Sequence, residues 1–281
     1  MRFARIMKLS VSLVVGAIDL AVRSLGPETK RSVQRRVVLY YHSVSQQQRE
    51  NFARQMDMLL GFSEALPLDS LGRPGIKAFG TAVTFDDGYK TILDNAVPEL
   101  VKRRIPFTIF IPSGNMGNFP KWLGKAESPA CGRIMNENEL KDLAGNGLAT
   151  FGSHCVNHPN LMLLDDLTAK NEFADSKKAL ESVLDLPVDF LSFPYGEFKN
   201  EHIELARWAG YRHVFTTIPS VISSGENNYA IGRVWTDPDD WDLEFRLKLS
   251  GAYRWTFRAS ALRRKIFNFS NIFKFLEKAV F

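Results

Sequence analysis

Residues 81–88 read Thr-Ala-Val-Thr-Phe-Asp-Asp-Gly, a short β-branched and aromatic run that ends in two adjacent carboxylates and a glycine. The run predicts a buried strand with a turn at its carboxyl end. Adjacent acids on a hydrophobic strand, Asp86 and Asp87, would repel each other and lose hydration unless a cation or a proton compensated them. Asp also often caps a turn or a helix, so the pair alone does not establish a site.

The central part of the chain alternates such strands with helical patterns. Strand-like runs lie at Val37–Tyr41, Thr81–Phe85, Phe107–Ile111, Leu148–Phe151, Phe190–Phe193 and Val214–Thr217, and helical patterns at Phe52–Leu60, Thr91–Arg104, Glu137–Asn146, Asp166–Leu184 and Glu201–Ala209. Strand and helix in alternation predict a mostly parallel sheet, either open or closed into a barrel. We expect one domain over residues 37–253, because no linker or internal repeat divides it.

Polar side chains gather where these strands would end. They are His42, Asp86, Asp87, His154, His158 and the Pro-Tyr-Gly stretch at 194–196. In a parallel sheet or barrel the carboxyl ends of the strands open on one face, which is where active sites lie. We therefore expect these residues, far apart in the sequence, to meet in one cleft.

The predicted cleft has the composition of a metal site. His154 and His158 are four residues apart, and two histidines with one Asp form a common catalytic metal set that leaves positions open for water. Two surface or capping histidines would give the same spacing, so the paired acids are needed for the argument. The only cysteines of the sequence, Cys131 and Cys155, are too few for a thiolate zinc site. We expect Cys155 to be a small packed group.

Length and composition are those of a globular protein with a sizeable core: 281 residues, 45% hydrophobic and 24% charged. The net charge of +5 is unevenly spread. Residues 1–36 contain eight Lys or Arg and two acids, residues 254–281 contain seven and one, and the part between them is acidic. An acidic body with two cationic, apolar-rich ends predicts an anionic surface as partner; we expect a membrane and no nucleic acid.

Each end has the pattern of a basic amphipathic helix. In residues 1–36, Arg2, Arg5 and Lys8 precede an apolar stretch that is too short and too charged to span a bilayer. We expect an uncleaved interfacial helix there, although a signal peptide would also have a positive start and a short apolar run. In residues 254–281 apolar residues recur at intervals of four and three among basic ones, which predicts a helix that packs on the body or contacts a membrane. The expected location is peripheral to a membrane, on either side of it.

Three stretches, in order, resemble the first three motifs of the polysaccharide deacetylase family, also called the NodB-homology or carbohydrate esterase family 4 proteins. They are residues 84–89 (Thr-Phe-Asp-Asp-Gly-Tyr), residues 152–159 (Gly-Ser-His-Cys-Val-Asn-His-Pro) and residues 192–196 (Ser-Phe-Pro-Tyr-Gly). The resemblance covers about residues 37–235. The opening at residues 37–44 (Val-Val-Leu-Tyr-Tyr-His-Ser-Val) resembles the branch that deacetylates poly-N-acetylglucosamine, in which the catalytic strands are circularly permuted. It implies an α/β fold, an irregular (β/α)7 barrel of the NodB type, here with amphipathic terminal helices.

The resemblance also implies a role for each residue of the predicted cleft. Asp87, His154 and His158 would hold a divalent cation, with zinc favoured over cobalt, nickel or iron. Asp86 would be the general base that takes a proton from the metal-bound water. The backbone N–H of Tyr195 would help to bind the oxyanion. The expected substrate contacts are Pro194, Tyr195 and Trp122.

The chain departs from the commonest family pattern in two ways. A protonated histidine must deliver a proton to the leaving amine, and most members place it near the end of the domain, whereas this sequence has no histidine after His213. His213 precedes its strand, so we assign the acid to His42, which ends the first strand and would lie beside the last strand of a closed barrel, as in the permuted branch. Ser192 stands where many relatives have an arginine that pairs with the base-orienting network. Arg233 would supply an equivalent charge, or would lie in an ordinary surface loop.

Two other side chains carry separate expectations. Trp122, in a long loop rich in Gly, Pro and Asn, would stack on a sugar ring or cover an apolar patch of its own loop. His202 begins a helix after a polar turn, and we expect it to be exposed to solvent.

Together these expectations describe a metal-dependent hydrolase that removes an N-acyl group, above all acetyl, from an amino sugar in a polysaccharide or a lipid-linked saccharide. Two alternatives stay open. A deformylase or an O-acetyl esterase would use the same activated water on a different carbonyl. A non-catalytic saccharide-binding member of the fold is disfavoured by the intact acid and histidine pairs, because a binding module has no need of a base beside a metal.

Overall fold

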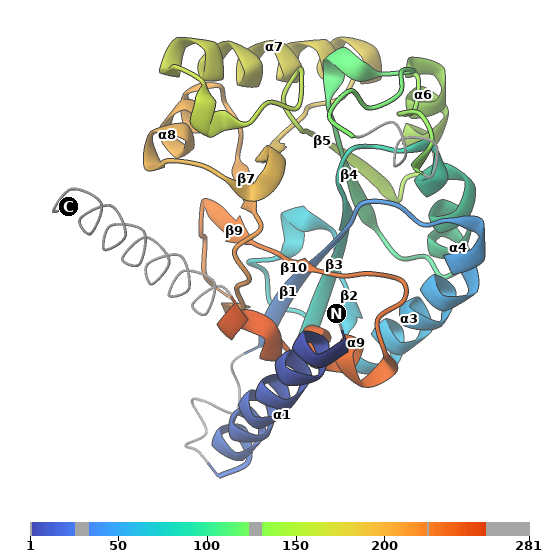
Figure 1. The fold of residues 1–281 in the computed structure, drawn as a ribbon, viewed down its shortest axis with the longest axis vertical. Coiled ribbons are helices and arrows are strands. Elements are labelled where there is room, and N and C mark those ends of the chain that lie inside the picture. Colours follow the sequence, from blue (N-terminus) through green and yellow to red (C-terminus); the bar gives the residue numbers. More distant parts are fainter. Residues whose placement is uncertain (1, 26–33, 124–130, 224, 257–281) are drawn as a thin grey trace, which may run out of the picture.

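The computed structural model describes residues 2–25, 34–123, 131–223 and 225–256. A largely parallel sheet curves into a barrel, with helices around its outside (Figure 1). The strands are β1 (Arg35–Tyr41), β2 (Glu64–Ala65), β3 (Phe79–Phe85), β4 (Phe107–Ile111), β5 (Ala149–Ser153), β6 (Phe190–Ser192), β7 (His213–Thr216), β8 (Ile222–Ser223), β9 (Ala230–Gly232) and β10 (Val234–Trp235). The helices are α1 (Arg2–Leu25), α3 (Arg49–Phe62), α4 (Val97–Lys102), α6 (Glu137–Ala144), α7 (Asp166–Leu184), α8 (Asn200–Trp208) and α9 (Asp242–Leu249). A π-helical turn, η3 (Ile92–Ala96), leads into α4.

The barrel closes through one interrupted strand. The sheet order is β10-β1-β3-β4-β5-β6-β7-β9, and β9 and β10 are separated only by Arg233. β9 pairs with β7 in parallel, whereas β10 pairs with β1 in parallel, with Leu39 opposite Val234. The stretch 230–235 therefore joins the two edges of the sheet. Counted as one strand, it gives the seven-stranded irregular barrel that the sequence predicted.

Hydrophobic residues cover both faces of the sheet. Inside the barrel a cluster includes one buried side chain each from several strands, among them Val38, Ala82, Phe110 and Phe215. A larger cluster fills the space between the outer face and the surrounding helices. Because both faces are buried, the strands have nearly continuous apolar runs rather than alternating ones.

The predicted elements are found at their expected places, with boundaries that differ by a few residues. The longest helix of the body, α7, has the predicted bounds, and the pattern at Thr91–Arg104 divides into η3 and α4. The sequence reasoning missed β2, β8, β9, β10 and α9. The four strands have two or three residues each, which is too short for a period to be recognised.

The N-terminal segment is a helix, as expected. α1 lies along the outside of the barrel against α9 and the 3-10 turn η7 (Ala252–Trp255), at the lower edge in Figure 1. Among the residues that the structure describes, no helix is both long and apolar enough to cross a membrane. The second expected amphipathic helix falls mostly in residues 257–281, which lie outside the described residues.

Candidate active site

The first half of the site is the sharp turn that follows β3. The N–H of Asp86 donates to the carbonyl of Tyr41 and so extends the ladder between β3 and β1 by one residue. Asp87 and Gly88 then adopt left-handed backbone angles, with φ of 68° and 64°. A side chain at Gly88 would place its Cβ 2.3 Å from Cδ1 of Ile111, so only glycine fits. The turn leaves both carboxylates buried, each residue 3% exposed.

The second half follows β5, which lies next but one to β3 in the sheet. His154 continues that strand, with its N–H donating to the carbonyl of Ile111. The chain then turns back, and the carboxylate of Glu172 on α7 accepts from the N–H groups of Val156 and Asn157. This anchored turn brings His158, with a left-handed φ of 54°, back beside His154.

The structure brings Asp87, His154 and His158 together, as the sequence predicted. One ligand atom from each lies within 4.8 Å of the others, and all three residues are buried. Oδ1 of Asp87 is 3.6 Å from Nε2 of His154 and 3.3 Å from Nε2 of His158. Ligands held 2.0–2.1 Å from a tetrahedral metal are about 3.4 Å apart, so these separations match the edges of a metal site.

The hydrogen bonds of the cluster also fit a cation. Nδ1 of His154 is 2.7 Å from the carbonyl oxygen of Ser192; because a carbonyl only accepts, Nδ1 donates and Nε2 has its lone pair free. Burial, with His158 as a further cause, lowers the pKa of His154 to about 4, so this imidazole is neutral at pH 7. Within the described residues, buried Oδ1 of Asp87 has no hydrogen-bond partner. These three residues are therefore a fitting ligand set for a divalent metal.

Asp86 is held by an arginine from the interrupted strand. Arg233 donates from two nitrogens to the two carboxylate oxygens of Asp86, at 2.7 and 2.8 Å. It also donates to the hydroxyls of Ser192 and Thr84, at 2.7 and 3.2 Å, and is 0% exposed. Of the two expectations for Arg233, the structure therefore selects the charge pair, and the surface loop is wrong.

This pair decides the ionisation of Asp86. Burial alone would raise the pKa of Asp86, but the guanidinium of Arg233 outweighs it, with smaller contributions from His154 and His42, so the pKa lies below its ordinary value. Asp86 is therefore an ionised carboxylate at pH 7. A carboxylate that lies beside the ligand set without belonging to it has the position of a general base.

His42 lies at the rim of this cleft. It follows β1, which the closed barrel places between β3 and β10 as predicted, and its ring packs edge-on against Tyr40 at 5.7 Å. His42 is exposed, unlike the three buried ligands. A positive charge on His42 contributes to lowering the pKa of both Asp86 and Asp87. Its acid role stays a prediction.

The predicted substrate contacts surround His158. Trp122 stacks on the His158 ring, with centroids 4.1 Å apart and planes 17° apart, and Tyr195 meets the same ring edge-on at 4.7 Å. Tyr195 has a left-handed φ of 59°, a strained conformation for a residue with a side chain. Gly196 follows it, where a Cβ would meet Oγ1 of Thr217 at 1.8 Å. Pro194 is buried at the start of this turn.

Known proteins that resemble this chain are polysaccharide deacetylases. The family model described as polysaccharide deacetylase matches residues 77–214, which contain both halves of the site. This part of the chain is similar to the polysaccharide deacetylase family. The solved structure of IcaB from Ammonifex degensii aligns with a TM-score of 0.67 and 26% identity, over 77% of this chain and 97% of that one.

Two curated bacterial relatives also match part of the chain. A putative polysaccharide deacetylase, YxkH, of Bacillus subtilis is 29% identical over 156 residues, which are 56% of this chain and 51% of the relative. Poly-beta-1,6-N-acetyl-D-glucosamine N-deacetylase of Staphylococcus aureus is 26% identical over 170 residues, which are 57% of this chain and 55% of the relative. The chain thus spans about half the length of these relatives.

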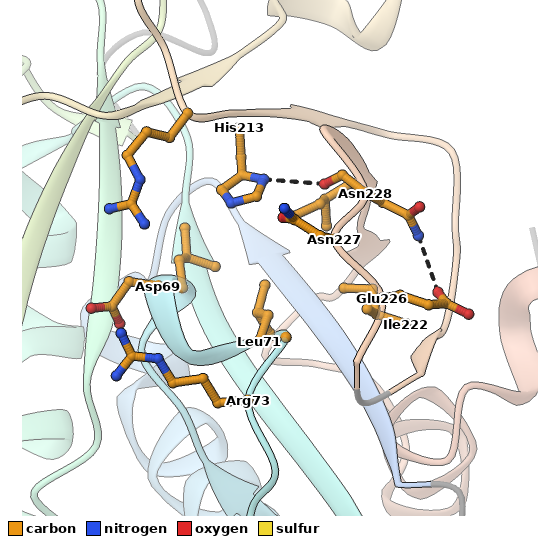
Figure 2. A pocket seen from close by; sticks show the side chains of 12 residues that line it. Asp69, Leu71, Arg73, His213, Ile222, Glu226, Asn227 and Asn228 are labelled. Carbon is orange, nitrogen blue, oxygen red and sulfur yellow. Dashed lines mark hydrogen bonds between the residues drawn. The ribbon is translucent and has the colours of Figure 1, made fainter.

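The remaining histidines lie away from the deacetylase cleft. His213 begins β7 and lines a pocket with Arg73 and Asn228 (Figure 2), where its Nδ1 is 3.1 Å from the carbonyl oxygen of Asn228. Because the amino ends of β7 and its neighbours surround this pocket, it lies at the opposite end of the barrel from the cleft.

The expectation that His202 is exposed is wrong. It is 0% exposed and accepts a hydrogen bond from the N–H of Lys199 at the start of α8, which buries the ring against Phe173. Cys155 is fully buried, which fits the packed group expected there.

Proposed function

We propose that this protein is a metal-dependent hydrolase that removes the N-acetyl group from an amino sugar of a polysaccharide or a lipid-linked saccharide. One observation carries the proposal: a buried Asp-His-His ligand set stands beside a separate carboxylate, Asp86, that Arg233 keeps ionised. The name of the Staphylococcus aureus relative supports an N-acetylglucosamine polymer as the substrate class. Of the cations that such a set accepts, zinc is the one we propose, ahead of cobalt, nickel and iron.

Each residue of the cleft has one task in this reaction. Asp87, His154 and His158 would hold a divalent cation, which would supply polarisation of the acyl carbonyl and a water molecule of lowered pKa. Asp86 accepts the proton as the water oxygen bonds to the carbonyl carbon. The N–H of Tyr195 donates to the oxyanion, and a single donor of this kind is worth about 3 kcal/mol. His42 gives its proton to the amine nitrogen as the C–N bond breaks, which releases acetate and the free amino sugar.

The experiment is an acetate-release assay on β-1,6- and β-1,4-linked N-acetylglucosamine oligomers, with the metal content measured in parallel. We expect a chelator to abolish release and added Zn²⁺ to restore it. Asp87→Ala should contain no metal and release no acetate, whereas the matched control Asp142→Ala, an exposed acid on α6, should behave as the wild type.

Three results would contradict the proposal. Undiminished acetate release from the chelated enzyme would remove the metal from the mechanism. Release of formate from a formylated amino sugar, with none of acetate from any oligomer, would move the activity to a deformylase. Acetate release from O-acetylated sugars alone would indicate an esterase instead.

A further inference from the structure

α1 is attached to the barrel by its polar side. Arg5, Ser12 and Asp19 recur every seven residues, so they lie on one face of the helix. A helix that packs on a soluble domain normally turns its apolar stripe inward and its polar face to water. In α1 the inward positions instead include two charged residues and a hydroxyl, beside Gly16, which lies against Leu247 and Ala252. This reversal needs a physical explanation.

The contacts of the inner face are ion pairs and hydrogen bonds. Nε of Arg5 donates to the carboxylate of Glu244 on α9 at 2.7 Å, and its guanidinium stacks over Trp241. Asp19 accepts from two nitrogens of Arg254, at 2.6 and 2.8 Å. These bonds tie the first and the fifth turns of α1 to the barrel.

The outer face of α1 carries an exposed apolar stripe. Its members are Met7, Val11, Val14, Ile18, Val22 and Leu25, at intervals of four and three. Val14 is 59% exposed and Ile18 is 57% exposed. In Figure 1 the helix stands at the rim of the molecule. Contiguous exposed apolar surface of this kind marks an interaction site, because isolated apolar residues are normal but an ordered stripe is not.

The charges of α1 indicate the occupant. Asp19, the one acid of this helix, is engaged with Arg254 and with Arg35, so the outer face has no negative group. Lys8 is exposed beside the stripe, whereas Arg5 and Arg35 are paired on the barrel side and Arg36 is buried. An apolar stripe with a lysine beside it and no acid complements an anionic lipid surface. A second copy of the chain would instead bring two equally cationic helices together.

The second basic end of the chain starts at the same place. Trp255 donates from its indole nitrogen to the hydroxyl of Ser12, in the middle of α1, at 2.9 Å. The described residues end one position later, at Thr256. Residues 257–281 are again basic and rich in phenylalanine. The described part of the chain therefore ends beside the middle of α1.

We propose that α1 docks the protein on an anionic lipid bilayer, with its apolar stripe in the boundary between headgroups and hydrocarbon and its polar stripe on the barrel. The inference goes beyond the proposed function and stands without it, because it concerns a surface that contains no residue of the cleft. The proposal explains why the polar face of α1 packs on the barrel: the polar face contacts charged residues of the barrel, and the apolar stripe contacts the bilayer.

The experiment is a flotation assay of the full chain with vesicles of about seven parts phosphatidylcholine to three parts phosphatidylglycerol, and with phosphatidylcholine alone. We expect the wild type to float with the anionic vesicles and less with the neutral ones. The double variant Val14→Glu, Ile18→Glu should partition at least about tenfold more weakly, because each of these side chains buries apolar surface in the bilayer. The matched control Leu167→Glu changes an apolar residue of α7 that is 68% exposed, at the opposite end of the molecule in Figure 1, and should float as the wild type.

Further measurements make the result decisive. All variants should keep the wild-type circular dichroism spectrum and the wild-type acetate release from soluble oligomers, so that failure of the proposed function leaves the vesicle result readable. If the glutamate pair does not fold, the uncharged pair Val14→Ser, Ile18→Ser replaces it and should also float more weakly than the wild type. Absence of wild-type flotation, or equal flotation of the double variant, would overturn the proposal. So would a wild-type dimer that the double variant dissociates, because the stripe would then bind a second copy.

Discussion

The protein uses charged pairs in two regions, with opposite degrees of burial. In the cleft, Arg233 and Asp86 form a pair whose side chains are 0% and 4% exposed. Under α1, Arg254 and Asp19 form a pair of similar length whose side chains are 36% and 15% exposed. Water can replace a partner that is lost under α1, but not one that is lost in the cleft. The comparison shows that the pair in the cleft fixes the geometry of the site, whereas the pair under α1 attaches an added helix.

The pair in the cleft has further contacts, although Nε of Arg233 has no hydrogen-bond partner among the described residues. Besides its four hydrogen bonds, the guanidinium of Arg233 lies over the rings of Tyr40 and Phe110, at 4.7 and 5.1 Å. Burial raises the pKa of Tyr40 to about 12, so this ring stays neutral beside the arginine. Among the described residues that accept hydrogen bonds from Arg233, only Asp86 is a carboxylate, so it alone balances the charge of the guanidinium group. Removal of either member leaves the other as a buried charge without a partner of opposite charge.

The largest effect is expected from Arg233→Met. It leaves Asp86 buried without a cation, which typically costs about 3–5 kcal/mol of the free energy of unfolding. Deacetylation should fall as well, because the base loses the group that orients it. Urea unfolding followed by circular dichroism measures the first effect and acetate release the second.

A double variant sharpens this test. Asp86→Asn combined with Arg233→Met removes both charges and should recover most of the lost stability, while acetate release stays abolished because no base is left. If Arg233→Met alone were as stable as the wild type, the pair would be dispensable, and the distinction between the two regions would fail.

A smaller and purely kinetic effect is expected from His42→Ala. General acid catalysis is commonly worth about 10²–10⁴ in rate, so turnover should fall by at least about a hundredfold. Because His42 is exposed at the rim, the free energy of unfolding should change by less than about 0.5 kcal/mol. The matched control is His213→Ala at the opposite end of the barrel, which should keep full activity. Wild-type turnover of His42→Ala would return the acid role to another group.

The sequence predicts the barrel and the meeting of the site residues, because a parallel sheet brings all carboxyl strand ends to one face. Asp87, His154 and His158 needed only this rule to be placed together. The role of Arg233 was not decided. It lies 147 positions from Asp86, between two strands of two and three residues that have no recognisable period.

The sequence also does not predict which face of a helix packs on the barrel. The periodicity of α1 indicates two faces, but it does not say which one packs on the barrel. The usual choice, apolar face inward, is the reverse of what is found, because the partner surface on α9 and η7 offers Glu244 and Arg254 beside a small apolar contact at Gly16. His202 shows the same limit at a helix start. Its Nδ1 accepts from the N–H of Lys199, and the ring is buried although its Nε2 has no hydrogen-bond partner among the described residues.

The smallest effect is expected from Asp19→Asn, which breaks the pair under α1. Partly exposed pairs are usually worth less than about 1 kcal/mol, so the free energy of unfolding should fall by no more than that at pH 7. Hydrogen exchange should show faster opening of α1 while the strands of the barrel stay protected.

The pH dependence of this small effect has a definite sign. Burial alone would raise the pKa of Asp19, but Arg254 and Arg35 outweigh it and hold the pKa below its ordinary value. A carboxyl whose pKa is lower in the folded state stabilises that state above the unfolded pKa of about 4, and this contribution is lost as the pH falls through the folded pKa. The difference in stability between wild type and Asp19→Asn should therefore be full at pH 7, shrink as the pH falls below the unfolded pKa of about 4, and vanish below the folded pKa. Asp142→Asn, an exposed acid on α6, should show no such difference at either pH. A difference that stayed constant into acid would mean that Asp19 contributes through packing, and the charge on the inner face of α1 would then not be what attaches the helix.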